Sequence, residues 1–285
     1  IFWDGQFSGR LRHEIYKEYK ANREKDFYNH REPKDPDLYI QKHRVSQYCE
    51  ELFIRQFQDE IIEADDSIGY YCSNIEDDEK VVIISNDRDM CQLIDDRVAI
   101  YVINLRKIIS KYNYCEHFNH HYTNVKLVKI LSGDASDNIK GIQGVKEKTL
   151  IKYFPEICKK TLTLKDIISK IEVLQNERKT RLKTLDNIKN KVTVGCQGED
   201  IFEINEKIIN LRKPLLTESA KEHLNNLFVS PIDPEDRTTK NVIKMMLEDG
   251  IIMAIPGGRD GYINFLKPFL RIIKKEKNFF NISKK

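Results

Sequence analysis

The chain has 285 residues and a mass of 33.6 kDa, with 40% hydrophobic and 33% charged residues. This length predicts one or two domains, and its 13 Tyr and 13 Phe argue against disorder. No apolar run approaches the roughly 18 residues of a membrane helix, and no signal segment opens the chain, so we expect a soluble, cytoplasmic protein without a membrane partner. The cysteines form no C-x-x-C pair, which argues against a zinc knuckle and predicts reduced thiols.

Apolar periodicity and turn residues predict an α/β part followed by a helical part, with the boundary near residues 110 to 125. The predicted elements are, in chain order, a strand at 1–4, a helix-compatible basic stretch at 11–28, a helix at 43–62, strands at 81–84 and 98–103 joined by a short helix, and helices after about residue 122, including a very basic stretch at 161–209. Strands that alternate with helices favour a parallel sheet. The chain starts with Ile1 inside an apolar run, so we expect that part of the natural N-terminus is missing.

Charge is distributed unevenly along the chain although the net charge is only +3. Residues 57–96 contain thirteen acids and two bases, whereas residues 138–191 contain fourteen bases and six acids. A basic surface beside an acidic centre fits an enzyme that holds a polyanion against metal ions, and two solvated faces of opposite sign are the alternative.

Acidic residues follow several apolar segments that we expect to be buried. They are Asp4, the group Glu63, Asp65 and Asp66, the pair Asp87 and Asp89, and the pair Asp134 and Asp137. Acids at the carboxyl ends of strands converge in open sheets, and clusters of carboxylates suit Mg²⁺ or Mn²⁺. Each group also has a simpler interpretation as a turn residue, a helix cap or an acidic first helical turn.

Two basic segments suggest contacts with nucleic acid. The glycine hairpin around Gly141 and Gly144 has a G-x-x-G spacing that exposes backbone N–H groups able to hold a phosphate without reading a base. Its candidate DNA-binding residues are Lys140, Gly141, Ile142, Gly144, Val145, Lys146 and Lys148. In the second segment Tyr19 could stack on a base, while Lys20 and Arg23 could hold a phosphate. A helix–turn–helix without ligand and a solvated basic helix are the alternatives.

The ordered motifs resemble the 5′-nuclease (flap endonuclease) superfamily. They are F-W-D-G, Y-K-A-N-R, E-A-D-D-S-I, I-S-N-D-R-D-M and L-S-G-D-A-S-D-N-I-K-G-I-Q-G-V, and they lie within residues 1 to about 155. The order looks closest to bacteriophage 5′–3′ exonuclease/RNase H proteins and to the 5′-nuclease domain of bacterial DNA polymerase I. The resemblance implies an α/β, PIN-like, mostly parallel sheet flanked by helices, followed by a helical helix–three-turn–helix DNA-binding part. It divides the chain into a nuclease core at 1–120, with a helical arch near 20–45, and a DNA-binding region at 121–285, with the helix–three-turn–helix at about 139–154.

The resemblance also assigns roles to individual residues. It implies metal ligation by Asp4, Glu63, Asp65, Asp66, Asp87, Asp89, Asp134 and Asp137, and a catalytic role for Lys20 and Arg23. The implied cofactors are two Mg²⁺ or Mn²⁺ ions and K⁺ at the helix–three-turn–helix. The implied partners of this monomer are DNA with a 5′ flap or single-stranded 5′ end, RNA–DNA hybrids and replication proteins. The implied function is metal-dependent hydrolysis of phosphodiester bonds in primer removal and repair.

One departure leaves alternatives open. The family places a further metal-binding Asp upstream of Asp4, and this sequence begins too late to contain it. A structure-specific DNA-binding protein with impaired catalysis is therefore the alternative function. A PIN-like ribonuclease is a second alternative, and the glycine hairpin argues against it because its expected partner is duplex DNA.

Overall fold

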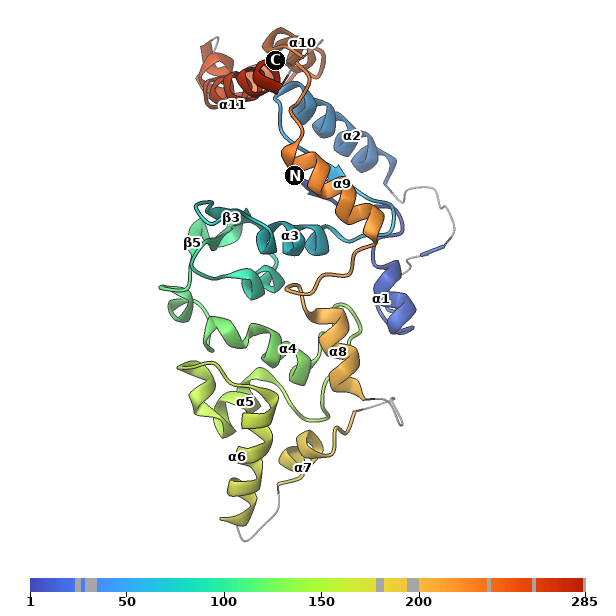
Figure 1. Cartoon of the computed structure of the whole chain (residues 1–285), viewed down its shortest axis with the longest axis vertical. Coiled ribbons are helices and arrows are strands. Elements are labelled where there is room, and N and C mark those ends of the chain that lie inside the picture. The colour runs from blue at the N-terminus through green and yellow to red at the C-terminus, as the bar shows by residue number, and fades with distance from the viewer. Residues whose placement is uncertain are drawn as a thin grey trace. The chain divides into compact units, whose positions relative to one another are not determined.

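The computed structural model of this chain describes residues 1–23, 27–28, 35–177, 182–193, 200–234, 237–257 and 260–283 (Figure 1). These residues belong to two compact units. Unit 1 consists of Ile1–Asp4, Asn29–Asp59 and Thr217–Lys285, and unit 2 consists of Gly5–Tyr28 and Glu60–Leu216. Unit 2 therefore contains residues from both sides of the predicted boundary near residue 120. None of the described helices is long and apolar enough to cross a membrane.

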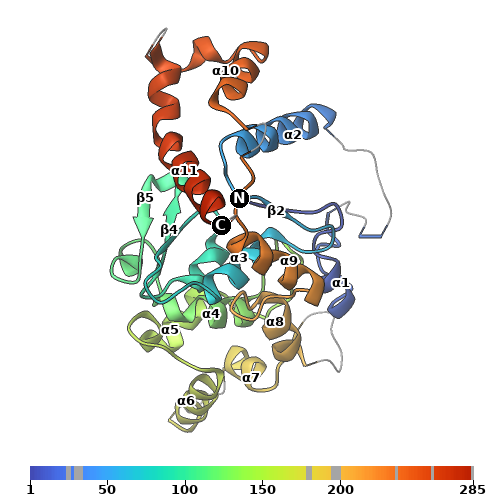
Figure 2. The same ribbon diagram turned by 45° about the horizontal axis from the view of Figure 1, so that its top comes forward.

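The sheet of unit 2 has three strands, in the order β3–β4–β5. β3 (Val81–Ile84) pairs with β4 (Val98–Val102) in parallel, and β5 (Lys107–Ile109) pairs with β4 in the antiparallel direction (Figure 2). The two strands predicted at 81–84 and 98–103 are confirmed, as is their parallel pairing. Their apolar, β-branched residues fit a sheet with a buried face.

A short 3-10 helix, η1 (Arg88–Leu93), connects β3 to β4. The side chain of Asp87 accepts a hydrogen bond from the backbone N–H of Asp89 at 2.8 Å and so caps η1. Met90 and Leu93 point into a core that also contains Ile100 from β4 and Tyr114. The chain therefore turns sharply at the end of β3, and this turn places Asp87 and Asp89 at the edge of the core.

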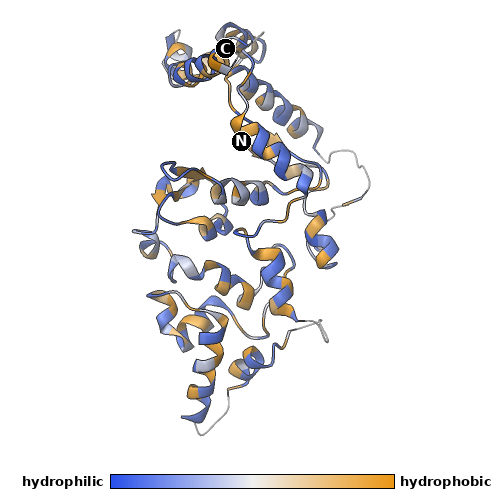
Figure 3. Cartoon of the chain, in the orientation of Figure 1, coloured by the Kyte–Doolittle hydropathy of each residue, from blue (hydrophilic) through white to orange (hydrophobic). Residues whose placement is uncertain are grey.

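Helices make up most of the rest of unit 2. They are α1 (Arg10–Ile15), α3 (Ala64–Ser73), α4 (Val125–Ser132), α5 (Glu147–Tyr153), α6 (Leu164–Asn176), α7 (Lys183–Lys189) and α8 (Ile201–Ile209). Hydrophobic and hydrophilic residues alternate along them (Figure 3). α4 packs against both α8 and η1, because its apolar residues face two neighbours at once. This packing joins the predicted nuclease core to the predicted DNA-binding region within one unit.

The helix expected at 11–28 is shorter than predicted. α1 ends at Ile15, where Tyr16 adopts an extended conformation, and turns follow up to Arg23. Tyr16 and Tyr19 are drawn into the same buried cluster as α4 and α8, and Lys20 has a positive φ of 53°. The Lys20 backbone N–H donates to the Asp137 carbonyl at 2.8 Å rather than to a carbonyl one helical turn earlier. Much of the predicted arch, at residues 24–26 and 29–34, lies outside the described residues.

Unit 1 contains β1 (Phe2–Trp3) and β2 (Phe57–Gln58), which pair in parallel. Its helices are α2 (Pro36–Glu51), α9 (Glu218–Val229), α10 (Thr239–Glu248) and α11 (Gly261–Ser283). The helix expected at 43–62 begins earlier and ends earlier, because Asp35 caps α2 ahead of Pro36 and Phe53 adopts a positive φ of 59°. Leu52, Val242, Met246 and Leu266 form the core of this unit.

Candidate active site

A buried arginine holds two acids of the E-A-D-D motif. Glu63 precedes α3 and Asp66 lies in its first turn, and both are buried. Arg12 of α1 forms ion pairs with both carboxylates, and its Nη2 donates to Asp66 Oδ1 at 3.0 Å. Arg12 Nε also donates to the Ile208 carbonyl at 2.7 Å. Burial raises the pKa of Asp66, and the Arg12 guanidinium only partly opposes this shift.

Glu63 also contacts the basic segment at Tyr19 and Lys20. The Tyr19 hydroxyl donates to Glu63 Oε2 at 3.0 Å, and Lys20 forms an ion pair with Glu63. Burial would raise the pKa of Glu63, but Arg12 and Lys20 outweigh it and lower the pKa to about 2. Gly9 makes this approach possible, because a Cβ at its φ of 90° would lie 3.1 Å from the Tyr19 ring and 3.3 Å from Glu63 Oε1.

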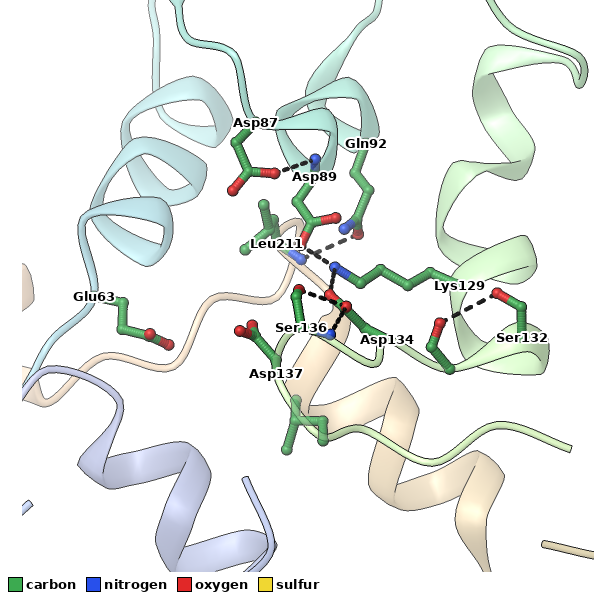
Figure 4. A network of polar contacts seen from close by, with 12 residues as sticks. Glu63, Asp87, Asp89, Gln92, Lys129, Ser132, Asp134, Ser136, Asp137 and Leu211 are labelled. Atoms are coloured by element: carbon green, nitrogen blue, oxygen red, sulfur yellow. Dashed lines mark hydrogen bonds and ion pairs between the residues drawn. The ribbon is translucent and has the colours of Figure 1, made fainter. Parts of the chain in front are cut away.

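A lysine lies between two further acids of the predicted site. The Lys129 ammonium forms ion pairs with Asp89, which follows β3, and with Asp134 Oδ2 at 2.8 Å (Figure 4). Burial would raise the pKa of Asp134, but Lys129 and Ser136 lower it to about 2. Burial raises the pKa of Asp89 despite Lys129. Lys129 stabilises both carboxylates in a place that water reaches poorly.

The basic segment and the acidic turn after α4 are joined directly. Arg23 Nη2 forms an ion pair with Asp137 Oδ1 at 2.6 Å, and the Lys20 backbone N–H donates to the Asp137 carbonyl at 2.8 Å. Gly133 starts this turn with a φ of 69°, and a Cβ there would lie only 2.3 Å from the backbone nitrogen of Gly141. The structure thus brings together residues that lie more than a hundred positions apart in the sequence.

Other predicted acids are placed differently. Asp87 is exposed and Asp65 is half-buried, and neither is in the ion pairs described above. Asp4 is exposed at the end of β1 in unit 1, the other compact unit. Among the described residues, no three His, Cys, Asp or Glu side chains come close enough together to hold a metal ion. Instead, Arg12 pairs with Glu63 and Asp66, Lys20 pairs with Glu63, and Lys129 pairs with Asp89 and Asp134.

The glycine hairpin at Ile139–Lys146 lies between α4 and α5, as predicted for a turn between two helical stretches. Ile142 and Val145 are buried, and the Ile142 N–H donates to the Leu131 carbonyl at 2.8 Å. These two side chains therefore anchor the hairpin in the core. Gly144, Lys146 and Lys148 are exposed, with Gly144 at a φ of 79°, and Lys140 Nζ donates to Asn138 Oδ1 at 3.0 Å.

Arg12 and Lys129 are not among the site residues predicted from the sequence. Arg12 carries no motif signal, because its partners lie 51 and 54 residues away. Lys129 could have been noticed, since it lies in the last turn of a mostly apolar helix that ends at the acidic turn. A lysine there also matches the general preference for cations at helix C-termini.

Comparison with known proteins identifies the family. A model of the 5′–3′ exonuclease N-terminal resolvase-like domain matches residues 1–122. The chain is 30% identical over 217 residues to a 5′–3′ exonuclease of Mycoplasmopsis pulmonis, with 70% of the chain and 69% of the relative covered. The chain belongs to the 5′–3′ exonuclease family. The resemblance seen in the motifs is thereby confirmed.

Other relatives are longer than the matched region. The 5′–3′ exonuclease of Buchnera aphidicola is 32% identical over 167 residues, which are 58% of this chain and 54% of the relative, so the chain spans about half of its length. DNA polymerase I of Bacillus subtilis is 33% identical over 153 residues, which cover 51% of the chain and 16% of the polymerase. These partial matches therefore support the family, and the activity and substrates of this chain belong to the proposed function.

Solved structures support the fold. A mutant of bacteriophage T5 5′-exonuclease matches with a TM-score of 0.57 and 19% identity, covering 80% of this chain and 82% of that one. The T5 flap endonuclease, in a pseudo-enzyme–product complex with DNA and metal ions, matches with a TM-score of 0.54 and 20% identity, covering 87% and 82%. The α/β class predicted from the sequence, with a mostly parallel sheet and flanking helices, is confirmed.

Proposed function

We propose that this site hydrolyses phosphodiester bonds at the 5′ ends or flaps of DNA and RNA–DNA, as in primer removal and repair. The observation that carries the proposal is the contact of the basic segment with two groups of acids. Arg23 pairs with Asp137 of the acidic turn at 2.6 Å, and Lys20 pairs with Glu63 at the start of α3. Cationic side chains beside carboxylates are what a nuclease needs to hold a phosphate next to metal-binding groups. Family membership supports the same reaction.

The proposed cofactor is Mg²⁺ or Mn²⁺, and the carboxylate donors of this structure suit such an ion. Asp89 and Asp134 fit one such ion, because their oxygens already converge on a cation, the Lys129 ammonium. Glu63, Asp66 and Asp87 are the proposed ligands of the other ion, with Asp65 and Asp137 as additional acids, and metal ligation by Asp4 stays a prediction from the sequence. Bound divalent ions would supply a hydroxide nucleophile near neutral pH and neutralise charge on the leaving oxygen. T5 5′-exonuclease has been solved with divalent zinc bound.

Within the chain itself, Lys20 and Arg23 are proposed to turn from their carboxylate partners toward the scissile phosphate. There they would offset the negative charge that develops during hydrolysis. Lys146, at the end of the glycine hairpin, and Lys148, in the first turn of α5, are exposed and are proposed to hold the duplex backbone, with K⁺ bound at the hairpin. The monomeric state, the cytoplasmic location and the contact with replication proteins stay predictions.

One observation favours the second candidate, a DNA-binding protein with impaired catalysis. Arg12 makes two contacts with the buried carboxylate of Asp66, and such a pair resists the exchange of its cation for a metal ion. If this exchange fails throughout the site, the same surface would bind branched DNA without cleaving it.

Cleavage of a 5′-labelled flap duplex in Mg²⁺, Mn²⁺ or chelator tests the proposal. Asp89→Asn should abolish metal-dependent cleavage while a gel-shift on the same samples shows retained DNA binding. Asp96→Asn is the matched control, because Asp96 follows the same helix η1 but is exposed and pairs with Lys111. Equal cleavage by wild type and Asp89→Asn would contradict the nuclease assignment, and binding without cleavage in the wild type would favour the second candidate.

A further inference from the structure

The contact between Lys129 and its two acids has a specific geometry. Asp89 comes from the turn after β3, and Asp134 comes from the turn after α4. Lys129 reaches from α4 into the space between them, as Figure 4 shows. The exposed fractions of the Lys129, Asp89 and Asp134 side chains are 14%, 26% and 18%. All three groups therefore interact in a place where water screens them poorly.

The charges of this cluster are not balanced. Two carboxylates and one ammonium leave one negative charge, whereas two carboxylates and one divalent ion are neutral. Carboxylate oxygens are also the ligands that Mg²⁺ and Mn²⁺ prefer. The ammonium is thus the weaker of the two possible counter-ions, although it removes most of the repulsion between Asp89 and Asp134 while no metal is bound.

We propose that Lys129 is the resident counter-ion of Asp89 and Asp134, and that a divalent ion binds there by displacing its ammonium. This inference rests on the proposed function, because it concerns the acids proposed to hold one metal ion. It adds that Lys129 lowers the affinity for the metal and stabilises the metal-free chain. Lys129 is therefore a positioning residue that holds Asp89 and Asp134 in place before a metal ion binds.

The displaced ammonium has room to move. A pocket beside Lys129 is lined by Tyr114, His117, His120, Ser132 and Glu147, and it also includes Asp89 and Asp134. Glu147, in the first turn of α5, is the remaining carboxylate in this lining. The flexible four-carbon stem of a lysine can turn within such a space. Glu147 is accordingly the acceptor expected for the displaced ammonium.

Calorimetric titration of the whole chain with Mn²⁺, without DNA, tests this inference. Lys129→Met should bind Mn²⁺ about tenfold more tightly than the wild type, because no charged hydrogen bonds must be broken first. Lys126→Met is the matched control, since Lys126 lies one turn earlier on α4 and pairs with Glu206 at 2.7 Å instead. The control should keep the wild-type affinity. Glu147→Gln should weaken Mn²⁺ binding, because the displaced ammonium loses its acceptor.

A second readout covers the case in which Lys129→Met folds poorly without metal. The temperature midpoint of unfolding should then rise more steeply with Mn²⁺ concentration in Lys129→Gln than in the wild type. Equal or weaker Mn²⁺ affinity in Lys129→Met, or an equal rise of the midpoint in Lys129→Gln, would overturn the inference. Flap cleavage is measured separately. If Lys129→Met binds Mn²⁺ more tightly than the wild type but the wild type does not cleave the flap, only the proposed function is contradicted. If the wild type cleaves the flap but both chains bind Mn²⁺ equally well, only the role of Lys129 is contradicted.

Discussion

Arg12 and Asp66 form a buried two-point ion pair, in which Arg12 Nη2 donates to Asp66 Oδ1 at 3.0 Å and Nη1 contacts Oδ2. The same guanidinium contacts Glu63 and donates to the Ile208 carbonyl at 2.7 Å. It therefore connects α1, α3 and α8 through one planar group. A guanidinium suits this position because its fixed fork of donors serves several acceptors at once.

Removal of this guanidinium should be strongly destabilising. Arg12→Met leaves Asp66 buried without a cationic partner, so the free energy of unfolding should fall by about 3–5 kcal/mol in urea denaturation. Arg12→Lys should recover only part of the loss, because one ammonium cannot replace the fork. Arg10→Met is the control, since the pair of Arg10 with Glu14 is exposed and should be worth about 0.5 kcal/mol. Similar losses in Arg10→Met and Arg12→Met would contradict this role of Arg12.

Alanine substitutions at Gly133 and Gly250 separate the cost of a steric clash from the cost of a left-handed backbone conformation. Their φ angles are 69° and 67°, but a Cβ at Gly133 would meet the Gly141 nitrogen at 2.3 Å, whereas a Cβ at Gly250 has no atom within 4 Å. Gly250→Ala should cost about 1–2 kcal/mol for the left-handed conformation alone. Gly133→Ala should cost clearly more and also reduce flap cleavage, because the turn that carries Asp134 must shift. Equal losses of unfolding free energy in the two variants would contradict this prediction, because the backbone around Gly133 would then move away from the added Cβ at little cost.

Much of the site could be predicted because acids follow apolar segments. The strand at 81–84 ends beside Asp87 and Asp89, and the apolar helix α4 ends beside Asp134. In open α/β sheets sites form at the carboxyl ends of strands, so polar residues directly after a strand are placed at that edge. The packing of α4 against η1 then brings Asp89 and Asp134 to a common cation.

The cationic partners could not be predicted in the same way. Arg12 and Lys129 make contacts set by tertiary packing, and local periodicity carries no information on packing between distant segments. The helix expected at 11–28 failed for a related reason. The segment after Ile15 makes tertiary contacts, such as that of the Lys20 N–H with the Asp137 carbonyl at 2.8 Å, and local helix propensity does not report such contacts.

The lowered pKa of Glu63 predicts an acid-sensitive contribution to stability. The pKa falls from an ordinary 4.5 to about 2 in the folded chain, so its contribution is complete above about pH 4.5 and is lost as the pH falls toward 2. The difference in unfolding free energy between wild type and Glu63→Gln should shrink over this range by on the order of 3 kcal/mol. Urea denaturation at several pH values, with chelator present, measures it. Glu14→Gln, at an exposed ion pair, should show little change, and a constant difference for Glu63→Gln would refute the lowered pKa.

Lys146 gives a prediction for the glycine hairpin. Lys146 is exposed near Gly144, which has a positive φ of 79°. The buried side chains of Ile142 and Val145 anchor the hairpin in the core. A phosphate contact carries no base information, so Lys146→Glu should weaken binding to all duplex sequences alike and lower the slope of log affinity against log salt by about one. Lys244→Glu, at an exposed position of α10, is the control and should change neither quantity. Gel-shift titrations at several salt concentrations on two unrelated flap sequences make the measurement. A loss confined to one sequence would mean that this hairpin reads bases, which contradicts a grip on phosphates alone.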